Sequence, residues 1–184
     1  DSLSPDVVQE VLCAFTGPIV VDADGLNVLA AAGRFTVNDP GRVIITPHPG
    51  EMRRLLKGRG VNASFDNSPK QRRAAAVALV EEYGFTVVLK GRGTVVTDGK
   101  RLYINETGNA GLASGGTGDV LTGVIAGLLG QKMAPLEAAI LGVYVHGLAG
   151  DFAAEELGRL SMDAVDVIEY LPEAFGEHSL LELD

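Results

Sequence analysis

The sequence has one cysteine and no tryptophan, and no apolar run approaches 18 residues without a glycine or a polar residue. A single thiol, Cys13, excludes an internal disulfide framework and is typical of a reducing compartment. Because its neighbours form an apolar helical pattern, we expect Cys13 to be buried. The short apolar runs and the lack of a signal-peptide pattern predict a cytoplasmic protein with no membrane partner.

Positive charge is also scarce. The formal net charge is −9, from 15 Lys and Arg against 24 Asp and Glu. This balance argues against general binding to nucleic acid or to an anionic membrane, so a polyanionic ligand needs donors that are built locally. The 184 residues, 46% of them hydrophobic, are enough for one domain with a core. We find no repeat, low-complexity tract or linker that would divide residues 1–184 into several domains.

A glycine-rich stretch, residues 109–119 (Asn-Ala-Gly-Leu-Ala-Ser-Gly-Gly-Thr-Gly-Asp), leads into a predicted helix. That helix has one apolar stripe at the 3.6 period, made by Val120, Leu121, Val124, Ile125, Leu128 and Leu129. The small residues before it let backbone N–H groups turn toward the positive end of the helix dipole. The stretch therefore predicts an anion cradle with phosphate as its ligand. Gly123 and Gly127 predict that another backbone packs closely along this helix.

Asp119, at the end of that stretch, is open to two interpretations. A carboxylate in the first helical turn is favourable for the dipole and could simply begin the helix. Beside an anion cradle, however, it would repel the anion unless it faces a different group. We favour a base that takes a proton from a hydroxyl while the cradle holds the phosphate being moved.

Polar residues follow three predicted strands, at residues 19–21, 43–45 and 86–89. Open α/β sheets place ligands at the carboxyl ends of their strands. Asp22, Asp24 and Asn27 follow the first strand, and a helix cap with a turn aspartate would explain one of these side chains but not all three.

His48 follows the second strand between two prolines, which hold it in an extended segment. We favour contact with a ligand over a solvated loop residue. Glu51 either lines the same site or is merely an early-helix charge.

The third strand delivers Lys90-Gly91-Arg92-Gly93-Thr94. The two glycines predict a bend where a nucleotide lies against the backbone with Lys90 near a phosphate; a solvated lysine at a strand end is the alternative. Residues 93–100 superficially resemble a P-loop, but five residues separate the glycines and Arg101 stands where a hydroxyl is needed. The stretch also lies on a predicted hairpin of residues 94–97 and 101–104, so we reject a P-loop.

Capping residues predict the ends of several helices. Ser4-Pro5, Ser68-Pro69 and Ala134-Pro135 begin helices, Gly84 ends one, and Ser161 caps the last. His146 falls on the apolar stripe of the helix over residues 136–157, so we expect a core histidine, and the glycines of this helix predict close packing. Strands followed by helices, then a hairpin and more helices, predict an α/β layered fold with a largely parallel sheet.

Four segments together resemble the ADP/ATP-dependent NAD(P)H-hydrate dehydratase family. They are residues 21–27 (Val-Asp-Ala-Asp-Gly-Leu-Asn), 46–52 (Thr-Pro-His-Pro-Gly-Glu-Met), 89–94 and 109–127, in the family's order. The Gly-Gly-Thr-Gly-Asp motif alone is shared with ribokinase-like sugar and vitamin kinases, whereas the first two segments are more specific. The resemblance implies the ribokinase-like fold, a three-layer α/β/α arrangement with a largely parallel sheet and a β-hairpin.

The resemblance also implies an activity, the repair of the S forms of NADHX and NADPHX, which are hydrated NADH and NADPH. ADP or ATP phosphorylates the ring hydroxyl, and loss of phosphate restores the cofactor and leaves AMP or ADP. Mg²⁺ accompanies the nucleotide. A homo-oligomer, a tetramer in the family, and an epimerase domain or protein are the implied partners.

Individual site residues carry over from the family motifs. Asp119 matches the base toward the substrate hydroxyl, and His48 matches a contact to the hydrated cofactor. Asp24, Asn27 and Glu51 lie in shared motifs as site-lining groups. The nucleotide and its phosphates are assigned to Lys90, Gly91, Arg92, Gly93, Thr94, Asn109, Gly115, Gly116, Thr117 and Gly118.

One departure from the family concerns length. The family domain has roughly a further 90 residues ahead of Ser4, within the range of a single domain. We therefore expect residues 1–184 to form the C-terminal two-thirds of that domain, and a sheet edge left exposed would favour association. Two alternatives stay open: a ribokinase-like kinase of a vitamin precursor, and a non-catalytic nucleotide-binding or assembly module.

Overall fold

A five-stranded sheet forms the centre of the protein in the computed structural model, which describes residues 4–32, 37–60 and 65–179. Its strands are β1 (Ile19–Val21), β2 (Val43–Ile45), β3 (Thr86–Leu89), β4 (Val95–Thr97) and β5 (Leu102–Ile104), in that spatial order. The first three are parallel, and β3, β4 and β5 are antiparallel. Both the parallel part and the β4–β5 hairpin were predicted from the sequence, and both are confirmed.

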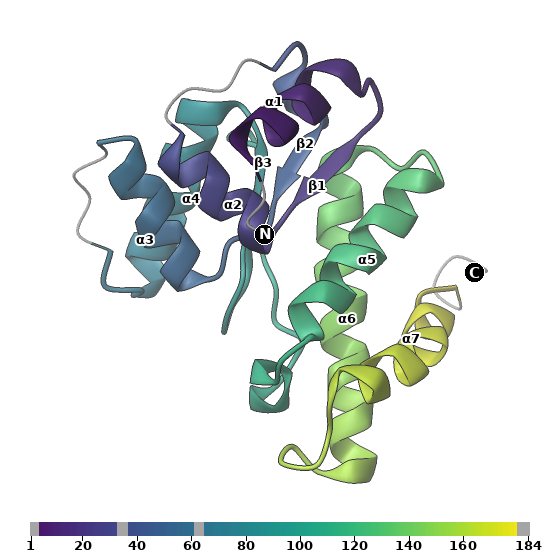
Figure 1. Cartoon of the computed structure of the whole chain (residues 1–184). Coiled ribbons are helices and arrows are strands. Elements are labelled where there is room, and N and C mark those ends of the chain that lie inside the picture. Colours follow the sequence, from purple (N-terminus) through teal and green to yellow (C-terminus); the bar gives the residue numbers. More distant parts are fainter. Residues whose placement is uncertain (1–3, 33–36, 61–64, 180–184) are drawn as a thin grey trace.

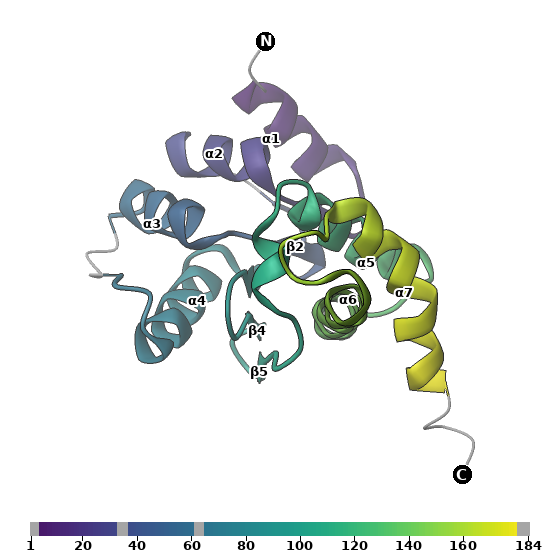
Figure 2. The same ribbon diagram turned by 90° about the horizontal axis from the view of Figure 1, so that it is seen from below.

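Helices cover both faces of this sheet (Figures 1 and 2). One layer consists of α1 (Pro5–Ala14), α2 (Ala23–Ala31), α3 (Pro49–Gly58) and α4 (Pro69–Tyr83). The other consists of α5 (Thr117–Gly130), α6 (Pro135–Leu157) and α7 (Ala164–Ser179), and α7 packs on α6. Two short 3-10 helices, η1 (Pro40–Arg42) and η2 (Ala110–Ala113), complete the elements of the described residues.

The alternation of side chains along the strands creates these two layers. In β2, Val43 and Ile45 face the core under α1–α4, whereas Ile44 faces the core under α5 and α6. Val87 and Val88 divide in the same way in β3. Strands buried on both faces need apolar residues at every position, which is why they read as short continuous apolar runs. The predicted three-layer α/β/α fold is confirmed.

Most of the predicted helix caps are present. The Ser4 hydroxyl accepts from the Asp6 amide at 3.3 Å, and Gly84 ends α4 in the left-handed region at φ +71°. The prediction of Ser161 as the last cap was wrong. Its amide donates to the Gly158 carbonyl in a turn, and the Asp163 carboxylate instead accepts from the amides of residues 165 and 166, the start of α7.

Two packing expectations also need correction. Cys13 is partly buried, not fully buried, because it lies toward the outer side of α1, where it accepts from the Gln9 side chain at 2.8 Å. Gly123 and Gly127 have no described atom within 4 Å of an added Cβ, so no backbone packs on that side of α5. The close contact lies on the α6 side instead, where a Cβ at Gly142 would come within 2.6 Å of Ile125.

Helix α6 is the one described helix that is long and apolar enough to cross a bilayer by length and composition. In the structure, however, 61% of the most apolar stretch of this helix is buried inside the protein. It packs against α5 and α7 and against the sheet, as Figure 2 shows from below. Burial within the fold therefore explains its composition.

Candidate active site at the N-terminus of α5

A cleft of about 1290 Å³ opens where the sheet meets the start of α5. Its walls come from α4, the segment after β3, the loop after β5, and α6. Among the residues predicted to bind the nucleotide, the following line it: Lys90, Gly91, Arg92, Gly93, Thr94, Asn109, Thr117 and Gly118. Residues of α4, of the stretch 90–121 and of α6 thus meet at one cavity.

The start of α5 presents unpaired backbone donors. Gly116 caps the helix at φ +90°, a conformation that favours glycine, and no side chain caps it. Within the described residues, no hydrogen bond takes up the amides of Gly118 or Asp119. Gly115 and Gly116 are exposed beside them. Free amides at the positive end of a helix dipole are suited to an anion.

The side chains of Thr117 and His146 fix the backbone at the start of α5. The buried Thr117 hydroxyl lies 2.7 Å from the Leu112 carbonyl oxygen and 2.9 Å from that of Ser114. The Nε2 atom of His146 lies 2.9 Å from the Thr117 carbonyl oxygen. Burial lowers the pKa of His146 to about 4, against a smaller opposing effect of the Thr117 carbonyl. The neutral ring therefore donates to that carbonyl, and the prediction of a core histidine is confirmed.

Lys90 makes an ion pair in the cleft. Its Nζ atom lies 2.8 and 2.9 Å from the two carboxylate oxygens of Asp22, at the end of β1. The Thr122 hydroxyl donates to one of these oxygens at 2.9 Å. A Cβ at Gly118 would lie 3.3 Å from Lys90 Nζ, so the ammonium group sits directly beside the start of α5.

The pKa of Asp22 is lowered by these contacts. Burial raises it, but the Lys90 hydrogen bond and charge, the Ala23 amide and the Thr122 hydroxyl together outweigh the burial. The carboxylate therefore stays ionised, which keeps the ion pair intact. The sequence analysis placed Asp22 among the polar residues at the carboxyl end of a strand but did not predict its contact with Lys90, and it assigned no role to Thr122. The sequence carried one signal for Thr122. It lies one helical turn after Gly118, so the two residues fall on the same face of α5.

Arg72, which the sequence did not single out, positions the segment after β3. It is only 4% exposed, and its Nη2 atom lies 2.8 Å from the Leu89 carbonyl oxygen and 3.3 Å from that of Lys90. Burial lowers its pKa. The spacing offered a signal, because Arg72 falls on the same face of α4 as the buried Ala75, Ala76 and Leu79.

Asn109 is held by α6. Its Nδ2 group donates to the Gly150 carbonyl at 2.7 Å and to the Asp151 carboxylate at 2.9 Å. The other oxygen of Asp151 accepts from the Gly108 amide. Asp151 thus fixes the wall of the cleft, and the Asn109 side chain is already engaged.

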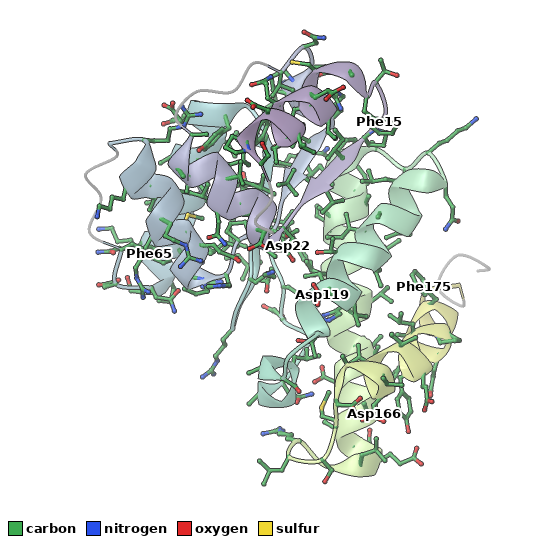
Figure 3. The ribbon with its side chains drawn as sticks, in the orientation of Figure 1. Phe15, Asp22, Phe65, Asp119, Asp166 and Phe175 are labelled. Carbon is green, nitrogen blue, oxygen red and sulfur yellow. The ribbon has the colours of Figure 1, made fainter. Side chains whose placement is uncertain are left out.

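Asp119 is exposed on the first turn of α5 and makes no ion pair or hydrogen bond within the described part of the chain. Figure 3 shows it on the same end of the sheet as Asp22. A carboxylate that is free and beside open amides is available to accept a proton.

The residues predicted on the substrate side lie outside the cleft lining. His48 is the N-cap of α3, where its Nδ1 accepts from the Gly50 amide at 2.9 Å. Glu51 returns the contact by accepting from the His48 amide at 2.8 Å, which completes a capping box. On α2, the Asn27 side chain lies 3.4 Å from the exposed Asp24. These contacts give His48 and Glu51 a structural role, and all four remain candidate ligand contacts.

A model of a family described as NAD(P)H-hydrate dehydratase matches residues 2–173. A bifunctional NAD(P)H-hydrate repair enzyme from Moorella thermoacetica is 46% identical over 94% of this chain and 32% of its own length. An ADP-dependent (S)-NAD(P)H-hydrate dehydratase from Neisseria meningitidis is 42% identical over 77% of this chain and 47% of its own.

Solved structures point the same way. The ADP/ATP-dependent NAD(P)H-hydrate dehydratase of Bacillus subtilis, co-crystallised with ATP and Mg²⁺, superposes with a TM-score of 0.73 at 33% identity, over 87% of this chain and 55% of that one. The chain therefore spans between a third and about half the length of these relatives. With the fold, the α5 cradle and a family match over nearly its whole length, the chain belongs to the NAD(P)H-hydrate dehydratase family.

Proposed function

We propose that the protein dehydrates the S forms of NADHX and NADPHX in a reaction that consumes ADP or ATP. The observation that carries the proposal is the start of α5, where the amides of Gly118 and Asp119 are open and the Lys90 ammonium group lies beside Gly118. The exposed Asp119 carboxylate stands on the same first turn, outside the cleft lining. The relatives support it, because their names state this activity and its dependence on ADP or ATP.

The chemistry requires little from the protein beyond positioning. The ring hydroxyl of the hydrated cofactor is a poor leaving group. Its oxygen attacks the terminal phosphorus of the nucleotide, Asp119 accepts the hydroxyl proton, and the bond to the remaining AMP or ADP breaks. The ring nitrogen then donates its lone pair, and the C–O bond breaks to release phosphate. The neighbouring ring carbon gives up a proton, which the released phosphate accepts, and the ring double bond of NAD(P)H is restored. The amides of Gly118 and Asp119 stabilise charge on the moving phosphoryl group.

The remaining contacts divide between the two substrates. The segment Lys90–Thr94, with Asn109 and residues 115–118, faces the nucleotide and its phosphates. His48, Asp24, Asn27 and Glu51, which lie on α2 and at the start of α3 beyond the cleft lining, contact the hydrated cofactor. Both ring nitrogens of His48 have partners, since Nδ1 accepts from the backbone and Nε2 lies 3.4 Å from a Glu51 carboxylate oxygen, so His48 and Glu51 would meet the cofactor as a pair.

The donor set near the cradle fits Mg²⁺ that arrives with the nucleotide. Mg²⁺ is commonly held by one or two carboxylates together with substrate phosphates. Here the free carboxylate is Asp119, while Asp22 is paired with Lys90, and the described residues contain no cluster of three or more metal-ligating side chains. When bound with the nucleotide, the ion would neutralise charge on the phosphates.

We also propose that residues 1–184 form the C-terminal two-thirds of one domain that assembles with other copies, as a tetramer, in the cytoplasm. Apolar side chains on α1 support association, since Val7, Val11 and Phe15 repeat at four-residue spacing and stay exposed. Figure 3 shows Phe15 at the outer surface. An epimerase domain or protein is the partner that relatives named bifunctional suggest.

One assay tests the proposal. Purified protein is incubated with NADHX, Mg²⁺ and ADP or ATP, and recovery of NADH absorbance is followed together with nucleotide products. Recovery of NADH with one AMP or ADP formed per turnover supports dehydration. Accumulation of a stable phosphate ester of a vitamin precursor instead of NADH would indicate a kinase, and nucleotide binding without turnover would indicate a binding module.

A further inference from the structure

Asp22 has no part in the chemistry above, yet it is firmly held. Its two carboxylate oxygens accept from Lys90 Nζ at 2.8 and 2.9 Å, and Thr122 donates to the second oxygen. The Asp22 side chain is only 10% exposed. Asp22 follows β1 as the N-cap of α2, Lys90 follows β3, and Thr122 lies in α5, so three parts of the fold converge on one carboxylate.

Lys90 is oriented by this contact. An ammonium group has three hydrogens, and two of them are directed at the Asp22 oxygens. The third remains for an oxygen of a ligand. Because a Cβ at Gly118 would lie 3.3 Å from Nζ, that ligand oxygen would also meet the open amides of α5. A flexible lysine is thereby fixed before the ligand arrives, which removes part of the entropic cost of binding.

Because Asp22 is negatively charged, it cannot itself bind the anion, and its role is to orient the Lys90 ammonium group. A Cβ at Gly118 would lie 4.0 Å from the nearer Asp22 oxygen, so the carboxylate stands close to the place of the anion. A negative charge there weakens anion binding unless a partner balances it. Lys90 balances it, and the net charge of the pair is zero.

We propose that Asp22 is a positioning residue that holds the Lys90 ammonium group against the terminal phosphoryl group of a nucleoside di- or triphosphate, and that Thr122 holds Asp22. This inference rests on the proposed function, because it takes the ligand of the α5 cradle to be that nucleotide. It predicts that Asp22 affects the rate of phosphoryl transfer more than the affinity for the nucleotide.

Titration calorimetry with ADP and Mg²⁺ tests whether Lys90 balances the negative charge of Asp22. Lys90→Met should weaken ADP binding about tenfold to a hundredfold, because a charge-assisted hydrogen bond is lost and Asp22 is left unbalanced. Asp22→Asn alone should change affinity less than about threefold. The double variant should bind about fivefold more tightly than Lys90→Met, since the repelling charge is gone. A double variant that binds as weakly as Lys90→Met, or more weakly, would overturn the proposal.

An exposed ion pair supplies matched controls. Arg101 and Glu137 lie 2.7 Å apart at the surface, away from the cleft lining. Arg101→Met and Glu137→Gln make the same kinds of change and should leave ADP affinity unaltered. Thermal melting of each variant identifies loss of fold, and Thr122→Ser, which keeps the hydroxyl, supplies a variant with intact packing.

Turnover separates this inference from the proposed function. With NADHX, Asp22→Asn should lower kcat at least about tenfold with little change in the KM for ADP. Thr122→Val, which lacks the hydroxyl, should lower kcat partly. Thr122→Ser, which keeps the hydroxyl, should have a kcat close to that of the wild type. If the wild type dehydrates NADHX and Asp22→Asn keeps its full kcat, the inference fails. If the wild type gives no NADH, the proposed function fails, and the ADP binding cycle still decides whether Asp22 balances Lys90.

Discussion

The buried guanidinium of Arg72 should determine both the stability of the protein and the order of the nucleotide segment. It donates to the Asn67 side chain at 2.7 Å and to the Leu89 carbonyl at 2.8 Å, and the Lys90 and Gly93 carbonyl oxygens lie 3.3 and 3.4 Å away. Arg72→Met keeps the length of the side chain and removes every one of these donors. The buried Leu89 carbonyl would then lack this partner.

The magnitude follows from the contacts. Hydrogen bonds from a charged group contribute about 1.5–3 kcal/mol each, so loss of two would cost about 3–6 kcal/mol. Relief of the buried charge, whose desolvation lowers the Arg72 pKa, offsets part of this loss. We expect a net loss of about 3 kcal/mol in the free energy of unfolding, which for a chain of this size lowers Tm by about 6–12 °C.

Calorimetric melting measures the first effect, and titration with ADP measures the second, a weaker affinity caused by a loosened Lys90–Thr94 segment. Arg54→Met is the matched control, because Arg54 is an exposed arginine on α3 outside the cleft lining. If Arg72→Met melts within about 2 °C of the wild type, Arg72 does not hold this segment as the contacts imply.

Three further predictions concern the cleft and its surroundings. Burial lowers the pKa of His146 to about 4 in the folded state, so its contribution to stability is present above the unfolded pKa of about 6.5 and is lost as pH falls from about 6.5 to about 4. Urea unfolding at pH 7 and 4.5 should therefore show about 2.5 kcal/mol of pH dependence that His146→Gln lacks. Gly118→Ala places a methyl group 3.3 Å from Lys90 Nζ and should weaken ADP binding at least about tenfold while the melting temperature stays unchanged. His48→Ala removes the cap of α3 and should cost about 1 kcal/mol, whereas His48→Asn keeps the cap; a raised KM for NADHX in His48→Asn would show a substrate contact, and an unchanged KM would leave only the cap.

Local patterns in the sequence predicted the framework of the fold. Continuous apolar runs located the strands at residues 19–21, 43–45 and 86–89, and caps such as Ser4 and Gly84 located helix ends. These signals depend on neighbouring residues, so one sequence carries them. The prediction of Ser161 was wrong because Ser161 and Asp163 are both suitable cap residues and lie two positions apart. Only the turn at Gly158, seen in the structure, shows that Asp163 begins the helix.

The contacts of the site were harder to predict, because they join distant residues. Asp22, Lys90 and Thr122 are separated by up to 100 positions in the chain, and no local pattern states that they meet. Gly123 and Gly127 show the converse, since their spacing permits close packing but cannot say whether any element is there. A capping box and a ligand contact also place the same residue types at His48 and Glu51, so the sequence could not separate the two roles.

The most direct test of the central claim is a comparison of Asp119→Asn with the wild type in NADHX turnover and in ADP binding. Asp119 is exposed, and its side chain makes no hydrogen bond or ion pair within the described residues, so the variant should melt like the wild type. We predict a loss of turnover of about a hundredfold or more, because a general base typically contributes about 10²–10⁴ in rate, with ADP affinity nearly unchanged. Full turnover in Asp119→Asn would show that this carboxylate is not the base.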